Sequence, residues 1–237
     1  MATPRDIINN GLELIGVLAP GETATADQLT SGLRSFNRML DSWSTENLMH
    51  YGETTEDFTL TASQQQYSMG SGGDFNTTRP IEILNMTWKD TSVSPNLELP
   101  IEIVPQEQWK FEEVKGTSSN IVTKAYINYG SSLVYINLWP VPSSAKKVSV
   151  TSNKPITTYT SLSTTITHPP GWLEAMEYNL ALRMRPSYGV PLDPAIQDIA
   201  MKSKANIKRQ NIKIMKVVSE VAFLNKNTGI FDYRTGE

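Results

Sequence analysis

Apolar residues recur at helical spacing near the start of the chain. Within residues 25–47, large apolar side chains are separated by steps of four, three, four and three: Leu29, Leu33, Phe36, Leu40 and Trp43. This spacing places all five on one face of an α-helix. Thr25 and Gln28 have the spacing of a capping box at its start. The apolar face requires a partner surface elsewhere in the chain.

A shorter amphipathic helix precedes this one. Thr3 suits the cap position, and Pro4 suits the first helical position. Apolar residues then follow at helical spacing: Ile7, Ile8, Leu12 and Ile15. Residues 4–47 are therefore predicted to form a helical hairpin in which the two apolar faces pack together.

The pattern changes to that of β-strands after Gly52. Apolar residues and threonines alternate over residues 58–62. Further apolar segments bounded by turn residues lie at 81–88, 97–103, 125–129, 133–139 and 147–151. The segment 105–115 predicts a short helix anchored by Trp109. Residues 53–167 are therefore expected to form an antiparallel β unit with polar loops.

Helical spacing returns at Pro170. Residues 172–185 are apolar around much of the helix circumference, and Asp193 can cap a further helix that starts at Pro194. That helix carries a narrow apolar arc: Ile196, Ile199, Ile207, Ile214, Val217 and Val221. The last segment, 224–237, is polar and cannot build a core alone. We expect it to be extended or disordered until a partner holds it.

Together these patterns predict an α+β fold. Its helical bundle is built from the N- and C-terminal helices, with an inserted antiparallel β domain and an extended C-terminal arm. The expected domains are a discontinuous helical bundle of residues 1–52 and 168–222, a β-rich domain of residues 53–167, and an arm of residues 223–237.

Composition narrows the class of function. The chain has 237 residues, no cysteine and a net charge of −3. It therefore has no disulfide framework and no thiolate chemistry, and its charge does not by itself indicate nucleic acid or membrane binding. The start of the chain lacks the basic and apolar regions of a signal peptide, and no apolar run is long enough to span a membrane.

Residues with catalytic potential are few. Neither His50 nor His168 lies in a cluster with metal-ligand spacing, so no metal or cofactor is expected. Four glutamates occur in close pairs: Glu112 with Glu113, and Glu174 with Glu177. Paired carboxylates can hydrolyse glycans, which leaves a peptidoglycan hydrolase as an alternative. Acid pairs on helices are more typical of solvated faces, and a non-enzymatic role is favoured.

Basic residues gather toward the C-terminus. Residues 171–217 contain eight Lys or Arg against four Asp or Glu. On a helix, four of them fall within about 60° of arc: Lys202, Arg209, Lys213 and Lys216. One interpretation is that these side chains border a buried apolar stripe. The other is a positive face toward DNA or an acidic neighbour, which would make the chain a sequence-independent DNA-binding module.

Several short motifs follow one another in an order typical of one family. They are Leu33-x-x-Phe36-Asn37-x-Met39-Leu40-Asp41-x-Trp43, Asp57 to Ala62, Gln66 to Gly70, Gly72 to Phe75, Arg79-Pro80-Ile81, Pro169 to Met176, Leu180-Ala181-Leu182 and Tyr188-Gly189. Over residues 4–217 the chain resembles the head-to-tail adaptors of tailed bacteriophages. These proteins are also called tail accessory factors, or packaged-DNA stabilisation proteins of short-tailed phages.

The resemblance implies a structural protein of the virion, assembled in the host cytoplasm and located where capsid meets tail. Such adaptors form a ring, usually of twelve copies, that is added beneath the portal after DNA packaging. The implied partners are the portal protein, tail or nozzle proteins, other copies of the chain, and packaged double-stranded DNA passing non-specifically through the channel. No membrane is involved.

The resemblance also suggests roles for particular residues. The C-terminal arm would reach the portal through four apolar anchors: Phe223, Ile230, Phe231 and Tyr233. The basic face would line the DNA channel or meet a neighbouring subunit through Lys202, Arg209, Lys213 and Lys216. The segment 53–167 is longer than the corresponding part of compact family members, and it would form an outer domain that meets tail proteins.

Overall fold

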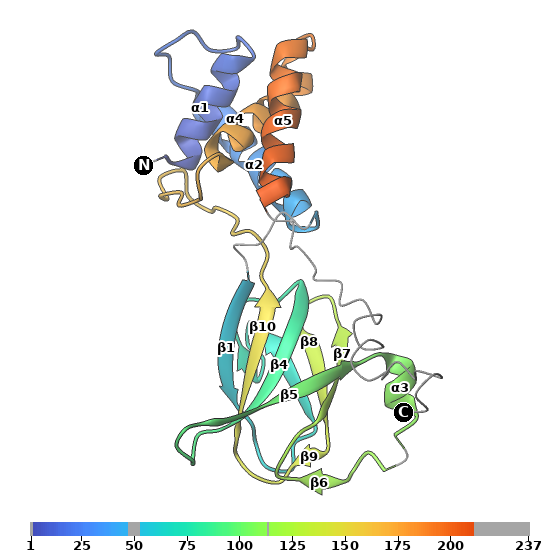
Figure 1. Ribbon diagram of the computed structural model, residues 1–237. Coiled ribbons are helices and arrows are strands. Elements are labelled where there is room, and N and C mark those ends of the chain that lie inside the picture. Colours follow the sequence, from blue (N-terminus) through green and yellow to red (C-terminus); the bar gives the residue numbers. More distant parts are fainter. Residues whose placement is uncertain (1, 47–52, 113, 211–237) are drawn as a thin grey trace, which may run out of the picture.

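A computed structural model describes residues 2–46, 53–112 and 114–210 of the chain (Figure 1). Helices gather at one end of the molecule, and a strongly curved β-sheet forms the other end. Each end has its own cluster of buried apolar side chains.

The sheet has eight strands in the order β1-β10-β4-β5-β7-β8-β2-β3. Their bounds are β1 (Glu53–Thr59), β2 (Gln66–Gly70), β3 (Phe75–Asn76), β4 (Glu82–Asp90), β5 (Leu97–Val104), β7 (Lys124–Tyr129), β8 (Val134–Trp139) and β10 (Lys147–Asn153). The two outermost strands approach each other, because Phe58 of β1 stacks on Phe75 of β3 with ring centroids 4.5 Å apart. The sheet is therefore nearly a closed barrel.

Alternating side chains fill the barrel. On β8, Val134, Ile136 and Leu138 are fully buried, whereas the intervening Tyr135 and Asn137 are more exposed. Apolar residues at equivalent positions of the other strands complete the core: Tyr67, Met69, Phe75, Met86, Trp88, Ile101, Ala125, Val148 and Val150. A second sheet of two short strands, β6 (Ser118–Ser119) and β9 (Val141–Pro142), lies beside the barrel.

The sheet is mixed, not antiparallel. β5 runs parallel to β7, and β2 runs parallel to β3. The connection between β5 and β7 runs from residue 105 to 123 and contains α3 (Gln106–Lys110), so the chain can turn back and enter β7 in the same direction as β5. A crossover connection of this length allows parallel pairing, whereas a tight hairpin does not.

Helices from the two ends of the chain share one apolar cluster. They are α1 (Pro4–Leu14), α2 (Ala26–Ser44), α4 (Trp172–Met184) and α5 (Pro194–Gln210), with a short 3-10 helix, η2 (Arg185–Tyr188), after α4. The predicted capping box of Thr25 with Gln28 is formed, and Thr3, predicted as a cap, forms a second capping box with Asp6. α4 packs against α1, α2 and α5 and is the central helix of the cluster.

The segment between the barrel and α4 is fastened to α2. The backbone N–H of Ile156 donates to Ser44 Oγ at 2.9 Å. Asn37 pairs with the backbone of Tyr159 in both directions, at 2.8 and 2.9 Å. Phe36 stacks on the Tyr159 ring with centroids 5.8 Å apart. Residues 157–167, predicted to belong to the β unit, therefore lie against the helices without forming a strand.

The predicted fold class, a helical bundle with an inserted antiparallel β domain and an extended arm, is wrong. The dominant element is the mixed, nearly barrel-shaped sheet, and the helices beside it are short, with 5 to 19 residues each. The division of the chain at residues 52, 167 and 222 stays a prediction. The predicted arm, residues 223–237, lies outside the described part of the chain.

Candidate functional site

Two lysines of α5 that do not belong to the predicted basic face contact the end of α2. Lys204 and Lys208 each place Nζ 2.7 Å from a carboxylate oxygen of Glu46, and the Lys204 ammonium lies 5.5 Å from the centre of the Trp43 ring. Partial burial of Glu46 disfavours its charge, but the two lysines outweigh that effect and hold its pKa below the usual range. These contacts fasten α5 to the end of α2.

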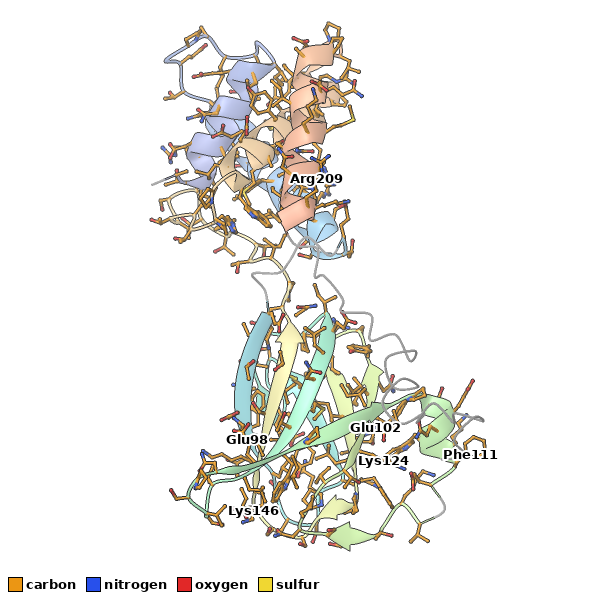
Figure 2. The ribbon with its side chains drawn as sticks, in the orientation of Figure 1. Glu98, Glu102, Phe111, Lys124, Lys146 and Arg209 are labelled. Carbon is orange, nitrogen blue, oxygen red and sulfur yellow. The ribbon has the colours of Figure 1, made fainter. Side chains whose placement is uncertain are left out.

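Two of the four predicted basic residues face solvent. Lys202 has a side chain that is 72% exposed and is paired with Asp198 at 2.6 Å, one helical turn earlier. Arg209 is also exposed, near the end of α5 (Figure 2). Lys213 and Lys216 lie outside the described residues, as do the predicted arm anchors Phe223, Ile230, Phe231 and Tyr233. The roles of all eight residues stay predictions.

The glutamates considered for hydrolysis do not form one site. Glu112 belongs to the barrel end of the molecule, where it forms an ion pair with Lys124. Glu174 and Glu177 belong to α4 in the helical end, and Glu177 accepts a hydrogen bond from Asn10 Nδ2 at 2.9 Å. Glu113 lies outside the described residues. Among the described residues, the fold therefore brings no glutamate of one pair close to a glutamate of the other pair.

His168 packs against two aromatic side chains. Its ring stacks on Trp172 with centroids 5.1 Å apart, and Nε2 lies 3.2 Å from the Tyr159 hydroxyl. Burial lowers the pKa of His168, because the charged imidazolium would lose its hydration. His50 lies outside the described residues. Within the described part, no three His, Asp or Glu side chains gather as metal ligands would.

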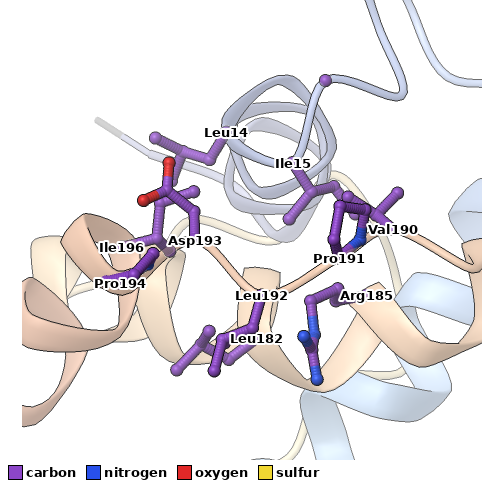
Figure 3. Close-up of a pocket in the computed structure, with 11 residues that line it drawn as sticks. Leu14, Ile15, Leu182, Arg185, Val190, Pro191, Leu192, Asp193, Pro194 and Ile196 are labelled. Carbon is purple, nitrogen blue, oxygen red and sulfur yellow. The ribbon is translucent and has the colours of Figure 1, made fainter.

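A hollow of about 510 Å³ lies between the end of α1, the end of α4 and the start of α5 (Figure 3). Its lining is mainly apolar and includes Leu14, Ile15, Leu182, Val190 and Leu192. The charged lining residues, Arg185 and Asp193, lie on different sides of it. Asp193 caps α5 by accepting from the Ala195 backbone N–H at 2.8 Å, as its sequence position predicts. No pair of polar groups converges here to perform chemistry.

The connection around α3 presents apolar side chains to solvent. We call residues 105–117 the α3 loop. Phe111 and Val114 are 83% and 65% exposed, and Figure 2 shows Phe111 at the outer side of the loop. Exposure of this size is unusual for an aromatic residue, since burying it removes a large apolar area from water.

The α3 loop is nevertheless held firmly against the barrel. Trp109 stacks on Tyr126 with ring centroids 5.9 Å apart. Trp139 Nε1 donates to the Val114 carbonyl at 3.1 Å, and Gln65 Nε2 donates to the Lys115 carbonyl at 2.8 Å. The ion pair of Glu112 with Lys124 adds a further attachment. The loop therefore presents Phe111 from a fixed base.

Sequence analysis identified Trp109 as an anchor but missed Phe111. Residues two apart on a helical turn point in different directions, so the two aromatic side chains cannot both face the barrel. With Trp109 turned toward the barrel, Phe111 must turn away from it. Recognising this requires knowing which of the two aromatic residues is the buried one, and apolar spacing does not distinguish them.

A second exposed apolar site lies at the tip of the β4–β5 hairpin. Val93 and Leu97 are 47% and 45% exposed. The base of the hairpin is fixed by Asp90, which pairs with Lys146 at 2.7 Å and accepts a hydrogen bond from the Ser92 backbone N–H at 2.9 Å. Hydrogen bonds and attraction from Lys146, helped by Ser92, lower the pKa of Asp90 to about 2.

A model of the SU10 adaptor protein family matches residues 4–201, which run from the start of α1 into α5. The chain belongs to the SU10 adaptor protein family. No curated protein matches the chain.

Membership of the SU10 adaptor family confirms the resemblance to phage head-to-tail adaptors that the motifs indicated. It makes the chain a structural protein of a bacteriophage and favours a non-enzymatic role. An SU10-type adaptor acts through the surfaces it offers to other virion proteins. Within the described residues, no helix is long and apolar enough to cross a lipid bilayer.

Proposed function

We propose that this adaptor forms a ring beneath the portal, where it retains packaged DNA and docks the tail. The match of residues 4–201 to the SU10 adaptor family carries the proposal, because it includes both the helices and the barrel. The expected ring has twelve copies. The portal protein above it and tail or nozzle proteins below it are its proposed partners.

The C-terminal arm, residues 223–237, is the proposed attachment to the portal. Its anchors are Phe223, Ile230, Phe231 and Tyr233. The ion pairs of Glu46 with Lys204 and Lys208 support this proposal, because they fix α5 close to the point where the arm's connection begins. An arm that starts from a fixed helix loses less conformational freedom when it binds.

The predicted basic face is proposed to line the channel or to meet a neighbouring subunit, through Lys202, Arg209, Lys213 and Lys216. Asp198 compensates the charge of Lys202, so attraction to DNA phosphates is weakened there. Weak contact suits a channel from which DNA must later leave. The affinity of the assembled ring for duplex DNA should be low and should fall with added salt, and a salt-independent affinity would exclude phosphate contact.

Electron microscopy of the full chain bound to the portal protein of its phage tests the proposed function. A closed ring attached to the portal, with twelve adaptor copies, is the expected result. A protein that remains monomeric and never joins the portal would contradict the proposal. The separation of the candidate glutamates between the barrel and the helices gives no support to the hydrolase alternative.

A further inference from the structure

Exposed apolar side chains concentrate along one segment of the barrel. Eleven large apolar residues are prominently exposed among the described residues, and six of them lie between residues 93 and 121: Val93, Leu97, Ile103, Phe111, Val114 and Ile121. Large exposed apolar patches on a folded protein commonly mark sites of protein–protein contact. This segment is therefore the strongest candidate for an interface outside the arm.

Two surfaces in this segment lie on opposite sides of the barrel. We call Val93 with Leu97 the hairpin surface, and Phe111 with Val114 the α3 surface. β5 crosses the front of the barrel from the hairpin to α3, and thus joins the two (Figures 1 and 2). Its eight residues span about 26 Å at ~3.3 Å per residue.

We propose that the α3 surface of one copy binds the hairpin surface of the next copy around the ring. The inference rests on the ring assembly proposed above and names the contact that builds it. A contact between two different surfaces is heterologous, and when its rotation closes it produces a ring. Two unlike surfaces on opposite flanks of one subunit are the arrangement that such a contact needs.

A second copy of this chain accounts for both surfaces at once. Each copy in a ring brings an α3 surface to one neighbour and a hairpin surface to the other, so one repeated contact covers all four side chains. A tail protein that bound Phe111 would leave Val93 and Leu97 exposed to water. Because a single repeated contact buries both exposed surfaces, the neighbouring copy is favoured as the occupant.

Both surfaces are fixed before they bind. The α3 loop is held by the stack of Trp109 on Tyr126 and by the hydrogen bond from Trp139. The hairpin is held by the ion pair of Asp90 with Lys146. Surfaces that are already ordered lose little conformational entropy on association, and an exposed aromatic residue on a rigid base has the character of an interface hot spot.

The absence of cysteine from the chain allows a direct cross-linking test. The variant carrying both Thr91→Cys and Lys110→Cys, two exposed positions that border the hairpin and α3 surfaces and leave their apolar side chains in place, is assembled with the portal protein of its phage, and the mass of the assembly is measured. The assembly is then treated with a short bis-maleimide and analysed under denaturing conditions. Neighbours joined head to tail should give a ladder of covalent oligomers extending to the full ring.

Two matched controls use one cysteine per chain. Rings made only of the Thr91→Cys variant, or only of the Lys110→Cys variant, should give no cross-linked product. Rings assembled from a mixture of the two should give covalent dimers and nothing larger. Dimers within either single variant would show a contact between like surfaces, which contradicts the head-to-tail arrangement.

Substitution of Phe111 provides a second, independent test. Phe111→Asp should lower the yield of rings by about tenfold or more, as expected for loss of a hot-spot residue, while Phe111→Leu should retain most of it. Both variants should unfold at the temperature of the original protein, because this side chain is exposed. Normal ring assembly by Phe111→Asp would overturn the inference, and if tail attachment alone were lost, the occupant would be a tail protein.

Failure of the inference and failure of the proposed function give different results. Rings of normal mass that yield no ladder from the double-cysteine variant would overturn the α3–hairpin contact and leave the ring intact. If the unmodified protein forms no ring with the portal protein, the proposed function itself is contradicted, and the contact with it.

Discussion

At the residue scale, two phenylalanines show how differently the same side chain is used. Phe36 is fully buried in the helical cluster, where it stacks on Tyr159. Phe111 lies in the α3 loop, which is held against the barrel, but its own side chain is exposed and belongs to neither apolar core. The buried ring contributes to folding, and the exposed ring remains available for association.

Substitutions at these two positions should therefore differ in their effect on stability. Phe36→Ala should lower the free energy of unfolding by about 3–5 kcal/mol, because it removes a buried ring and leaves a cavity. Phe36→Asp should unfold the helical end, since it buries an unpaired charge. Phe111→Ala, the matched control, should change stability by less than about 0.5 kcal/mol. Denaturant titration measures all three, and full stability of Phe36→Asp would show that this face of α2 is wrongly assigned.

His168 should make stability depend on pH. Burial lowers its pKa in the folded state below the unfolded value of 6.5, so below pH 6.5 the unfolded chain binds the proton more readily. Stability contributed by the neutral imidazole should be complete above that pH and decline as the pH falls toward the folded pKa. His168→Phe should retain stacking on Trp172 and flatten this part of the profile in thermal melts between pH 5 and 8. An unchanged slope would assign the dependence to other groups.

At the element scale, ion pairs between the end of α2 and α5 hold the C-terminal half of α5 in position. Glu46 lies two residues beyond the end of α2 and binds Lys204 and Lys208, which are one turn apart on α5. Lys204 and Lys208 lie on the flank of α5 that also borders its buried apolar stripe. Their role is structural, whereas Lys202 and Arg209 on the other flank remain accessible.

Glu46→Gln should loosen this attachment. Because the three side chains are partly exposed, the expected loss in the free energy of unfolding is modest, about 1 kcal/mol. A double-mutant cycle with Lys204→Met isolates the interaction, and Lys202→Met is the control because its partner is Asp198. A coupling energy of zero between positions 46 and 204 would show that the pair does not hold α5.

Elements were predictable where local signals agreed. Apolar spacing and a capping box located α2, and Asp193 and Pro194 located the start of α5. Short apolar segments bounded by turn residues located the strands β4, β5, β7, β8 and β10. Strand direction was not predictable, because alternation is the same in parallel and antiparallel strands, and the pairing of β5 with β7 depends on how the α3 loop packs.

At the scale of the whole molecule, the sequence predicted a helical bundle as the main unit of the fold, whereas the sheet is the dominant unit. Each strand is short, and only their assembly through Trp88, Ile136, Val150 and their neighbours makes the barrel the dominant unit. The candidate site was predictable as a class, since the ordered motifs identified the adaptor family. The exposed Phe111 was not, because exposure depends on the packing of Trp109 against a strand that follows it in the chain.

Deletion of residues 224–237 should separate folding from attachment. The truncated protein should keep the melting temperature of the full chain, because the described helices and barrel contain both apolar cores. It should lose attachment to the portal protein, since the proposed anchors Ile230, Phe231 and Tyr233 are removed. Co-sedimentation with the portal measures this, and normal attachment of the truncated protein would show that the arm is not the anchor.

The mass of the complex between the full chain and the portal protein tests the central claim most directly. Native mass spectrometry of that complex, with the free protein measured alongside, gives the number of adaptor copies held at the portal. We expect a single closed ring of twelve copies on the portal. A mass equal to the portal alone, with every adaptor chain remaining free, would contradict it.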